Sequence, residues 1–575
     1  MGAQRERARV NRAPLVGALA ASAALLAVRL YAAKHVGFGD AEALYACYAR
    51  HPQPVYVDHP GLIGVVARIV GGGSSPSPWA AHQLTAWLAT AAPWVAALAA
   101  RAAGASPTAC ARAALVLMLA PEISVGLFGL TPDLLLILLW YAALGTSLWA
   151  LAAEPGSMRA LVGALGSGLA AGLAFDAKIT GGLLLAGLAL GWAAPQARSH
   201  RRTLAPFAGL ALALVMVSPV ILDEVARGFP MLHHRLIDTQ KDAGLSLRNV
   251  GALLGGQLLY VTPPLLLGAF AVFRDLHRRR CDDAASQLLW SVTMATLPLV
   301  LLCCVSRVAE PHWVAPVYLA LPLHLARGNG RLFGVGLARS AVATGAIVTA
   351  AAHAWVLFPI GARLLGGSYT PRYDLANDLY AWQAGLPVVR RALAESIDPE
   401  RPPPIVVGPH WTVCAQAHAG LAVEVLVGCH TDAPDDFARW LPASVWQRSP
   451  TILYVTDDRF DARVEDLRDH RPDVSWQAEV RRGGVLVRRI TVLRLIASAV
   501  ARANPRTERG SYNTLVRPIF GLTESLPLER NSFSSTHLRS NGGGSDDIQL
   551  SLETRAIVNR PSLAIPIALW QKHFN

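Results

Sequence analysis

Residues 133–153 read DLLLILLWYAALGTSLWALAA. The stretch carries a single charged side chain, the aspartate at its first position. An α-helix of about 20 apolar residues crosses the roughly 30 Å hydrocarbon core of a bilayer. Residues 133–153 therefore predict a transmembrane helix.

Further apolar stretches flank this one throughout the first 361 residues. The chain is 53% hydrophobic and 16% charged with a mean hydropathy of +0.35, whereas about a quarter of a soluble domain is charged. We expect an all-α polytopic membrane protein with about eleven transmembrane helices. The predicted spans are 14–33, 79–100, 113–130, 133–153, 160–176, 178–195, 203–222, 250–273, 287–305, 312–326 and 340–361.

The charged loops predict how the spans are oriented. Arginines precede the first span and recur in every second loop, which places those loops and the N-terminus in the cytoplasm. The first loop (34–78), the corner at 131–133, loop 223–249 and everything after 362 then lie on the outer side of the plasma (inner) membrane. The net charge of +13 is largely this orientation signal, so we expect no nucleic-acid partner.

The chain changes character after the last predicted span. Residues 403–408 and 451–458 read as strands, 379–395 and 435–446 as helices, and 476–495 as a hairpin that turns at Gly483 and Gly484. We expect a bundle over 1–361, a small extracytoplasmic α/β domain over 362–495, and a disordered tail over 496–575. Cys414 and Cys429 can pair if this domain is exported, but the sequence does not decide this.

The first outer loop is richer in polar residues than a connector requires. Asp40 and Glu42 follow the first span, and Tyr56, Asp58 and His59 precede a short apolar segment at 61–70. One interpretation makes Asp40 and Asp58 helix caps. The other makes these side chains part of an active site at the membrane surface, and a capped helix is compatible with both.

Other polar residues come to the same side of the membrane. Asp133 opens a span and Lys178 separates two spans, while Arg307, Glu310 and His312 lie near the outer end of another. Capping explains Asp133, and a lysine at an interface extends its amine to water. A cation beside several carboxylates is also what a phosphate-bearing substrate requires. We expect no metal site, because the cysteines and histidines show no ligand spacing.

These motifs, taken in order, resemble glycosyltransferase family 39. The resemblance rests on Asp40-x-Glu42 after the first span, the Tyr56-x-Asp58-His59-Pro motif, Thr-Pro-Asp133, Lys178 after GLAF, and EPxWxAPxY beginning at Glu310. It runs from about residue 14 to 490. The chain has Gly61 where the family usually has a second proline, which is expected to loosen the loop, and His312 where an asparagine is common.

The resemblance implies the GT-C fold and sugar transfer from a polyprenyl-phosphate donor to a lipid, glycan or protein acceptor at the external face. In this interpretation Asp40 is the general base and Glu42 orients it or the sugar. Tyr56, Asp58, His59, Asp133, Glu310 and His312 would contact the substrate, with Lys178 and Arg307 on its phosphate. No cofactor or metal is implied, and the partners are the donor, the acceptor and membrane lipids.

Two alternatives remain, a multi-span transporter and a non-catalytic membrane scaffold. Transporters place ionisable or broken segments near the middle of the bilayer. The predicted spans are instead continuous, with their charges at the rim, which favours the transferase.

Overall fold

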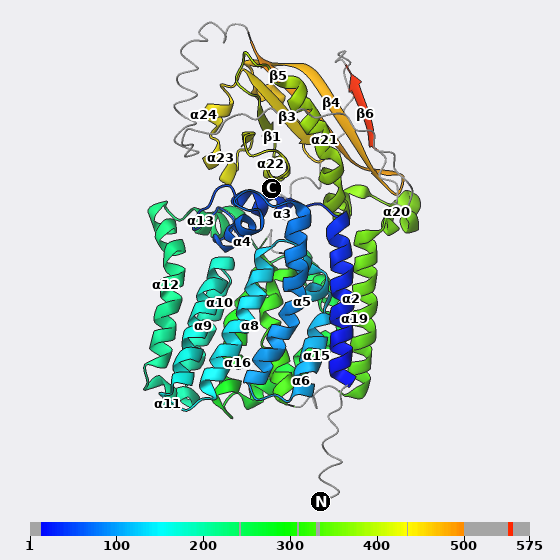
Figure 1. The fold of residues 1–575 in the computed structure, drawn as a ribbon. Coiled ribbons are helices and arrows are strands. Elements are labelled where there is room, and N and C mark those ends of the chain that lie inside the picture. Colours follow the sequence, from blue (N-terminus) through cyan, green and yellow to red (C-terminus); the bar gives the residue numbers. More distant parts are fainter. Residues whose placement is uncertain are drawn as a thin grey trace, which may run out of the picture.

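A helical bundle and a mixed α/β domain make up the computed structural model, which describes residues 13–240, 243–306, 310–328, 334–433, 435–498 and 550–555. The α/β domain covers one end of the bundle, and the first helix starts at the opposite end (Figure 1). The architecture is thus the predicted one, a polytopic bundle with a small C-terminal domain.

The bundle contains helices of very different length. Its long helices are α2 (Ala13–His35), α5 (Pro78–Ala102), α8 (Pro132–Leu151), α9 (Met158–Ala177), α12 (Ala205–Ala226) and α19 (Val335–Leu357). The others are α3 (Asp40–Tyr48), α4 (Leu62–Val70), α6 (Pro107–Met118), α7 (Pro121–Ser124), η1 (Gly126–Phe128), α10 (Gly181–Ala193), η2 (Pro195–Ala197), α11 (Arg198–Arg201), α13 (Pro230–Leu236), η3 (Asp238–Gln240), α14 (Leu247–Tyr260), α15 (Pro263–Arg279), α16 (Ala284–Thr296), α17 (Pro298–Val305), η4 (Pro311–Tyr318) and α18 (Leu321–Arg327).

The described residues hold 7 helices long and apolar enough to cross a membrane, or up to 9 if each bent pair counts as one span. α16 and α17 together form one of the seven. Two of the eleven predicted spans are shorter than a membrane crossing. Residues 178–195 give the 13-residue α10, and residues 312–326 give the short helices η4 and α18.

Two predicted spans are bent rather than continuous. α6 meets the α7–η1 segment at 81°, and α14 meets α15 at 99°. Thr262 precedes two prolines at the second bend and has a φ of 78°, and proline cannot donate the hydrogen bonds that would continue a helix. The expectation of continuous spans is therefore wrong at these two places.

The loops separate to the two ends of the bundle as the charge pattern predicts. The basic α11 lies at the end where α2 starts, whereas α3, α4 and α13 lie beneath the α/β domain (Figure 1). The described helices of the predicted outer loops 34–78 and 223–249 that Figure 1 labels thus share one end with the domain.

The α/β domain is a sheet with helices packed on it. Its strands are β1 (Ile405–Gly408), β2 (Val427–Cys429), β3 (Thr451–Asp457), β4 (His470–Arg482), β5 (Val485–Ala497) and β6 (Leu550–Arg555), in the order β2-β1-β3-β5-β4-β6. β1 pairs parallel with β2 and β3, and the other pairs are antiparallel. Its helices are α20 (Ile360–Leu365), α21 (Asp378–Ser396), α22 (Trp411–Gly420), α23 (Asp436–Trp440) and α24 (Ala443–Trp446).

Most elements expected in this domain are present. The predicted hairpin turns at Gly483 and Gly484, whose positive φ angles of 58° and 82° suit a tight turn that favours glycine. The helix predicted over 435–446 is instead the two short helices α23 and α24. The prediction of disorder over 496–575 is wrong at 496–497, which end β5, and at 550–555, which form β6; otherwise it falls on 499–549 and 556–575, outside the described residues.

One hydrophobic cluster joins the first loop to the α/β domain. It contains Phe38 and Cys47 from around α3 together with Trp382, Val413 and Phe437 from the domain. Because these side chains share one core, the domain fixes the position of the first loop. A residue at the start of α3 therefore lies between bundle and domain.

Candidate active site

The first loop folds into α3, whose first turn holds the two predicted catalytic acids. Asp40 is the first residue of α3, and Gly39 is its N-cap residue. Glu42 accepts a hydrogen bond from the Gly39 N–H at 2.9 Å. The expectation that Asp40 caps the helix is therefore wrong.

Glu42 is buried and fully engaged by protein groups. Its Oε1 lies 2.9 Å from Nε2 of His82 on α5 and accepts a hydrogen bond from the Leu130 N–H at 2.7 Å. Burial alone raises the pKa of Glu42, but His82 and the two backbone N–H groups outweigh burial and lower it. Glu42 therefore holds α3 against α5 and the segment before α8.

Replacing Glu42 with alanine is expected to lower the free energy of unfolding by roughly 2–4 kcal/mol, because buried donors on His82 and Leu130 lose their acceptor. The lowered pKa means that this contribution is present above the unfolded value of about 4.3 and is lost as the pH falls through the folded value. Thermal unfolding of the detergent-solubilised chain at several pH values measures both effects. Glu42→Gln, which keeps one acceptor oxygen, is the control; an alanine variant as stable as the parent would contradict this role.

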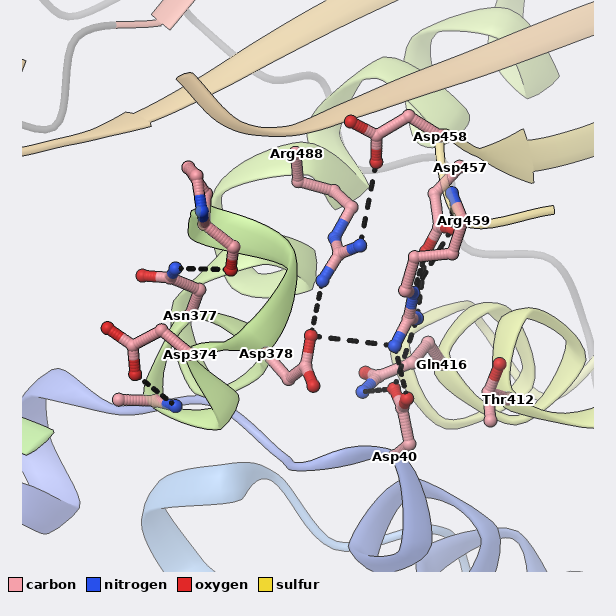
Figure 2. A network of polar contacts seen from close by, with 12 residues as sticks. Asp40, Asp374, Asn377, Asp378, Thr412, Gln416, Asp457, Asp458, Arg459 and Arg488 are labelled. Atoms are coloured by element: carbon pink, nitrogen blue, oxygen red, sulfur yellow. Dashed lines mark hydrogen bonds and ion pairs between the residues drawn. The ribbon is translucent and has the colours of Figure 1, made fainter. Parts of the chain in front are cut away.

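Asp40 enters an ion-pair network contributed by the α/β domain (Figure 2). Arg459 donates from Nη1 to the Asp40 carboxylate at 2.5 Å and from Nη2 to Asp457 at 2.8 Å. Gln416 on α22 donates to Asp40 at 3.3 Å, and Asp378 at the start of α21 lies 3.4 Å from Arg459. Asp40 thus binds the first loop to the domain, and its carboxylate already has a cationic partner.

The same network contains an acid that titrates close to neutral pH. Burial, and then the charge of Asp40, raise the pKa of Asp378 to about 6. Arg488 pairs with Asp378 and lies 3.5 Å from Asp458. The network's negative charge therefore grows as the pH rises through 6.

Tyr56 supports the backbone of the first loop. Its ring stacks on Tyr48 with 3.5 Å between the ring centroids, and its hydroxyl donates to the His51 carbonyl at 2.8 Å. The side chain is 0% exposed. The structure thus turns the Tyr56 hydroxyl toward the loop's own backbone.

Gly61 tightens this loop rather than loosening it. Its N–H donates to the Pro54 carbonyl at 2.8 Å, a bond that proline cannot make. An added Cβ would stand 2.3 Å from the Gln53 carbonyl oxygen. The expectation of a looser backbone is wrong, because glycine permits this close approach.

Asp58 pairs with Arg235 of α13 and does not cap α4, whose N-cap residue is Gly61. Arg235 Nη2 lies 3.0 Å from the Asp58 carboxylate, and Arg235 Nε donates to the Asp58 carbonyl at 3.0 Å. Burial raises the pKa of Asp58, but Arg235 and His234 lower it further than burial raises it. Asp58 is therefore charged and orients a guanidinium at the surface of the bundle.

His59 is a neutral, buried imidazole. Burial, and then Arg235, lower the pKa of His59 to about 3. Arg235 Nη2 lies 3.4 Å from His59 Nε2, which therefore accepts, so the proton is on Nδ1. Nδ1 is buried and has no hydrogen-bond partner within the part of the chain that the structure describes. His59 thus holds a donor for a bound group.

Lys178 and Asp133 form an ion pair between two helix ends. Lys178 follows the last residue of α9, and Asp133 lies in the first turn of α8. The ammonium donates to both carboxylate oxygens at 2.7 and 2.9 Å. Lys178 is only 8% exposed, and the helix C-terminus beside it also favours a cation.

Glu310 and His312 stand at the start of η4. His312 Nδ1 lies 3.1 Å from the Glu310 carboxylate. Arg307, predicted beside them as a phosphate contact, lies outside the described residues. This end of η4 therefore supplies one imidazole and one acid to the domain end of the bundle.

Most of the predicted site residues converge. Lys178, His312 and His59 all act electrostatically on Asp133, although they come from separate segments of the chain. The converging set, called the outer cluster below, consists of Asp58, His59, Asp133, Lys178, Arg235, Glu310 and His312. Asp40, Glu42 and Tyr56 make the other contacts described above.

An apolar cavity, open on one side, adjoins this cluster. It lies among α6, α7, α14, α15, η4 and α18 and is lined mainly by aliphatic side chains. Five polar side chains interrupt this lining: Glu122, Gln257, Tyr260, His312 and Tyr318. His312 belongs both to the cavity and to the outer cluster, so the cavity reaches the charged site.

Three residues of this region were not anticipated from the sequence. Glu122 lies in a stretch interpreted as one continuous span, although a charge inside a span costs about 2.5–3.5 kcal/mol by insertion scales and so signals a break. Arg235 follows His233 and His234 in the loop 223–249, and the sequence predicted no role for it. Arg459 lies in a turn of the distant domain, where the sequence offers no signal.

The described residues include no group of three or more His, Cys, Asp or Glu side chains suited to a metal ion. The positive charges of the outer cluster come from Lys178 and Arg235. Both are partly neutralised by one carboxylate each, and both have further hydrogen atoms to donate. The site can therefore bind an anionic group through protein cations.

Two comparisons relate the chain to known proteins. The family model "Dolichyl-phosphate-mannose-protein mannosyltransferase" matches residues 60–222. The crystal structure of ArnT from Cupriavidus metallidurans bound to undecaprenyl phosphate superimposes with a TM-score of 0.55 at 17% identity, covering 86% of this chain and 100% of that chain. The chain has an ArnT-like GT-C fold. The resemblance to family 39 predicted from the motifs is confirmed.

The apo form of the same ArnT gives a TM-score of 0.54 at 16% identity, with 86% of this chain and 100% of that chain covered. No curated protein matches the sequence. The likeness to ArnT is thus one of fold.

Proposed function

We propose that this membrane glycosyltransferase moves a sugar from a polyprenyl-phosphate-linked donor to a lipid, glycan or protein acceptor. The observation that carries the proposal is the junction of the apolar cavity with the outer cluster at His312. A lipid phosphate needs both environments at once, since its tail must remain among apolar groups while its phosphate meets cations. The family match and the fold support the same reaction class.

The outer cluster provides the groups that such a donor requires. Lys178 and Arg235 are placed to stabilise the negative charge that grows on the phosphate as the glycosidic bond breaks. The free Nδ1–H of His59 can donate to a phosphate or sugar oxygen. The departing phosphodiester needs no proton, so no general acid is required.

The acceptor hydroxyl needs a base, and we propose Asp40. The support is its position in the first turn of α3, next to the outer loop, and the family resemblance of its motif. Arg459 occupies the Asp40 carboxylate, so this ion pair must lengthen for the acceptor hydroxyl to reach Asp40. Glu122 is the competing carboxylate, because it lines the cavity and has no ion pair within the described part of the chain.

We propose that the domain-bearing end faces the outside of the plasma membrane and the N-terminus the cytoplasm. Arginine-rich loops at the opposite end support this orientation. The two bent helix pairs are a feature that transporters also show, but here both bent pairs contribute lining to the apolar cavity. They therefore fit a lipid groove as well as a transport path.

Narrowing the cavity is expected to weaken binding of a long-chain donor. Ala269 on α15 lines the cavity, and Ala269→Trp fills part of the space that the lipid tail would occupy. The KM for a long polyprenyl-phosphate donor should rise about tenfold or more, in line with the roughly 0.8 kcal/mol lost per excluded CH2, while the KM for a donor with a short tail changes little. Ala211→Trp on the exposed face of α12 is the matched control, and equal KM changes for both donors would refute the tail assignment.

Mass spectrometry of envelope glycolipids and glycoproteins, with and without the chain, tests the function directly. We expect one glycan-modified species to appear only with the active chain. It should be missing with the Lys178→Met variant discussed below. An unchanged glycan profile, together with no transfer from polyprenyl-phosphate sugars in reconstituted vesicles, would refute the proposal.

A further inference from the structure

Two cysteines of the α/β domain lie against each other. Cys414 is on α22 and Cys429 ends β2, and their Sγ atoms are 2.7 Å apart. Both are thiols in the structure. The separation is closer than two unbonded sulfur atoms normally rest, and a small side-chain rotation brings them to the roughly 2.05 Å of a disulfide.

The surroundings leave these two sulfur atoms few other partners. Cys414 is 0% and Cys429 6% exposed, and Cys414 makes one further contact, a long one of 3.5 Å to the Gly408 carbonyl. Asp435 is the other polar neighbour of Cys429, and burial, then Cys414 and then Asp435 raise the pKa of Cys429. In the folded domain the pair is thus poorly placed to react with a metal or an electrophile.

We propose that Cys414 and Cys429 form a structural disulfide in the mature protein. The inference rests on the outward orientation of the domain in the proposed function, since disulfides persist in oxidising compartments. The two thiols lose two protons and two electrons, and the acceptor is a disulfide of that compartment, which is reduced to two thiols. The exchange takes place before α22 packs, because both sulfur atoms are buried afterwards.

The bond would fix the element that holds the first loop. Gln416 lies on α22 two residues from Cys414, and its amide donates to the Phe38 carbonyl at 3.0 Å and to Asp40. Cys47 of α3 also packs there, with its Sγ 3.4 Å from the Ala415 carbonyl. Linking α22 to β2 therefore stiffens the surface on which α3 rests.

The sequence provides a clean test in the full-length chain. No lysine or arginine lies between Arg401 and Arg439, so trypsin leaves both cysteines in one peptide, while Glu424 lies between them. Intact cells are treated with maleimide, and the chain is purified without reductant and cleaved after arginine and glutamate. We expect the Cys414 and Cys429 fragments to remain joined, unalkylated and lighter by two hydrogen atoms, until reduction separates them.

Other outcomes overturn the proposal in distinguishable ways. Alkylation of both cysteines upon unfolding without reductant would refute the bond, as would a cross-link that contains Cys47. Cys281 is exposed in the loop between α15 and α16 and reports orientation: a membrane-impermeant maleimide should not label it in intact cells. If Cys414 and Cys429 are free thiols and Cys281 is not labelled, the disulfide alone is refuted. If Cys281 is labelled in intact cells, the proposed orientation is refuted.

A stability measurement gives a second readout. The double variant Cys414→Ala/Cys429→Ala should lower the Tm by roughly 5–10 °C under non-reducing conditions, as expected for a closed loop of this size. The parent treated with reductant after mild unfolding should fall to the same Tm. A parent whose Tm is unaffected by reduction would contradict a bond in the native state.

Discussion

Replacing Lys178 with methionine is expected to lower the rate of sugar transfer by about 100- to 1,000-fold, the loss typical of removing one charge-stabilising donor. The lysine ammonium is nearly buried and donates to both oxygens of Asp133 at 2.7 and 2.9 Å. Methionine keeps a similar length but supplies no charge to a departing phosphate. The effect should fall on kcat measured at saturating donor, in vesicles that contain equal amounts of folded chain.

The control has to separate catalysis from folding, because Lys178→Met leaves the Asp133 carboxylate unpaired. An unpaired, fully buried charge costs roughly 3–5 kcal/mol, and the Asp133 side chain, which is 28% exposed, should cost part of this. The double variant Lys178→Met/Asp133→Asn removes both charges, so it should regain stability and remain inactive. Lys178→Arg should retain part of the activity. Transfer at the parent rate by the double variant would show that Lys178 serves only to neutralise Asp133.

The sequence predicts that the residues of the outer cluster lie on the same side of the membrane, and the reason is physical. Spans cross the membrane one after another, so loop charges assign each helix end to one side. Asp133 and Lys178 are 45 residues apart, and this counting places both at the domain-bearing end. The ion pair between Asp133 and Lys178 depends on how α8 packs against α9. Their location on the same side of the membrane could be predicted without knowing that packing.

Other contacts depend on packing that no local pattern encodes. Asp40 and Arg459 are 419 residues apart, and their meeting depends on how the α/β domain sits on α3. A capping pattern at Asp40 looks the same whether or not an arginine approaches it. Glu122 was missed for the opposite reason, since the apolar residues around it suggested an unbroken helix and obscured the bend at α7.

Replacing Asp40 with asparagine is expected to reduce transfer by about 100- to 10,000-fold, the range for losing a positioned base. Asparagine retains the size and an oxygen that can accept from Gln416 and Arg459, so the first loop should stay bound to the domain. The loss should appear in kcat at every pH. Single-turnover transfer from a polyprenyl-phosphate sugar, with the Tm as a check of folding, measures it.

Two companion variants decide what Asp40 does. Arg459→Met removes the ion pair but leaves the carboxylate, so a base at Asp40 predicts that this variant keeps transfer. If Asp40 serves only to bind the α/β domain, Arg459→Met and Asp40→Asn should each lower the Tm. The loss of activity in each variant should then follow its loss of Tm. Glu122→Gln tests the rival base: loss of transfer there, with parent-like transfer in Asp40→Asn, would assign proton removal to the carboxylate that lines the lipid cavity.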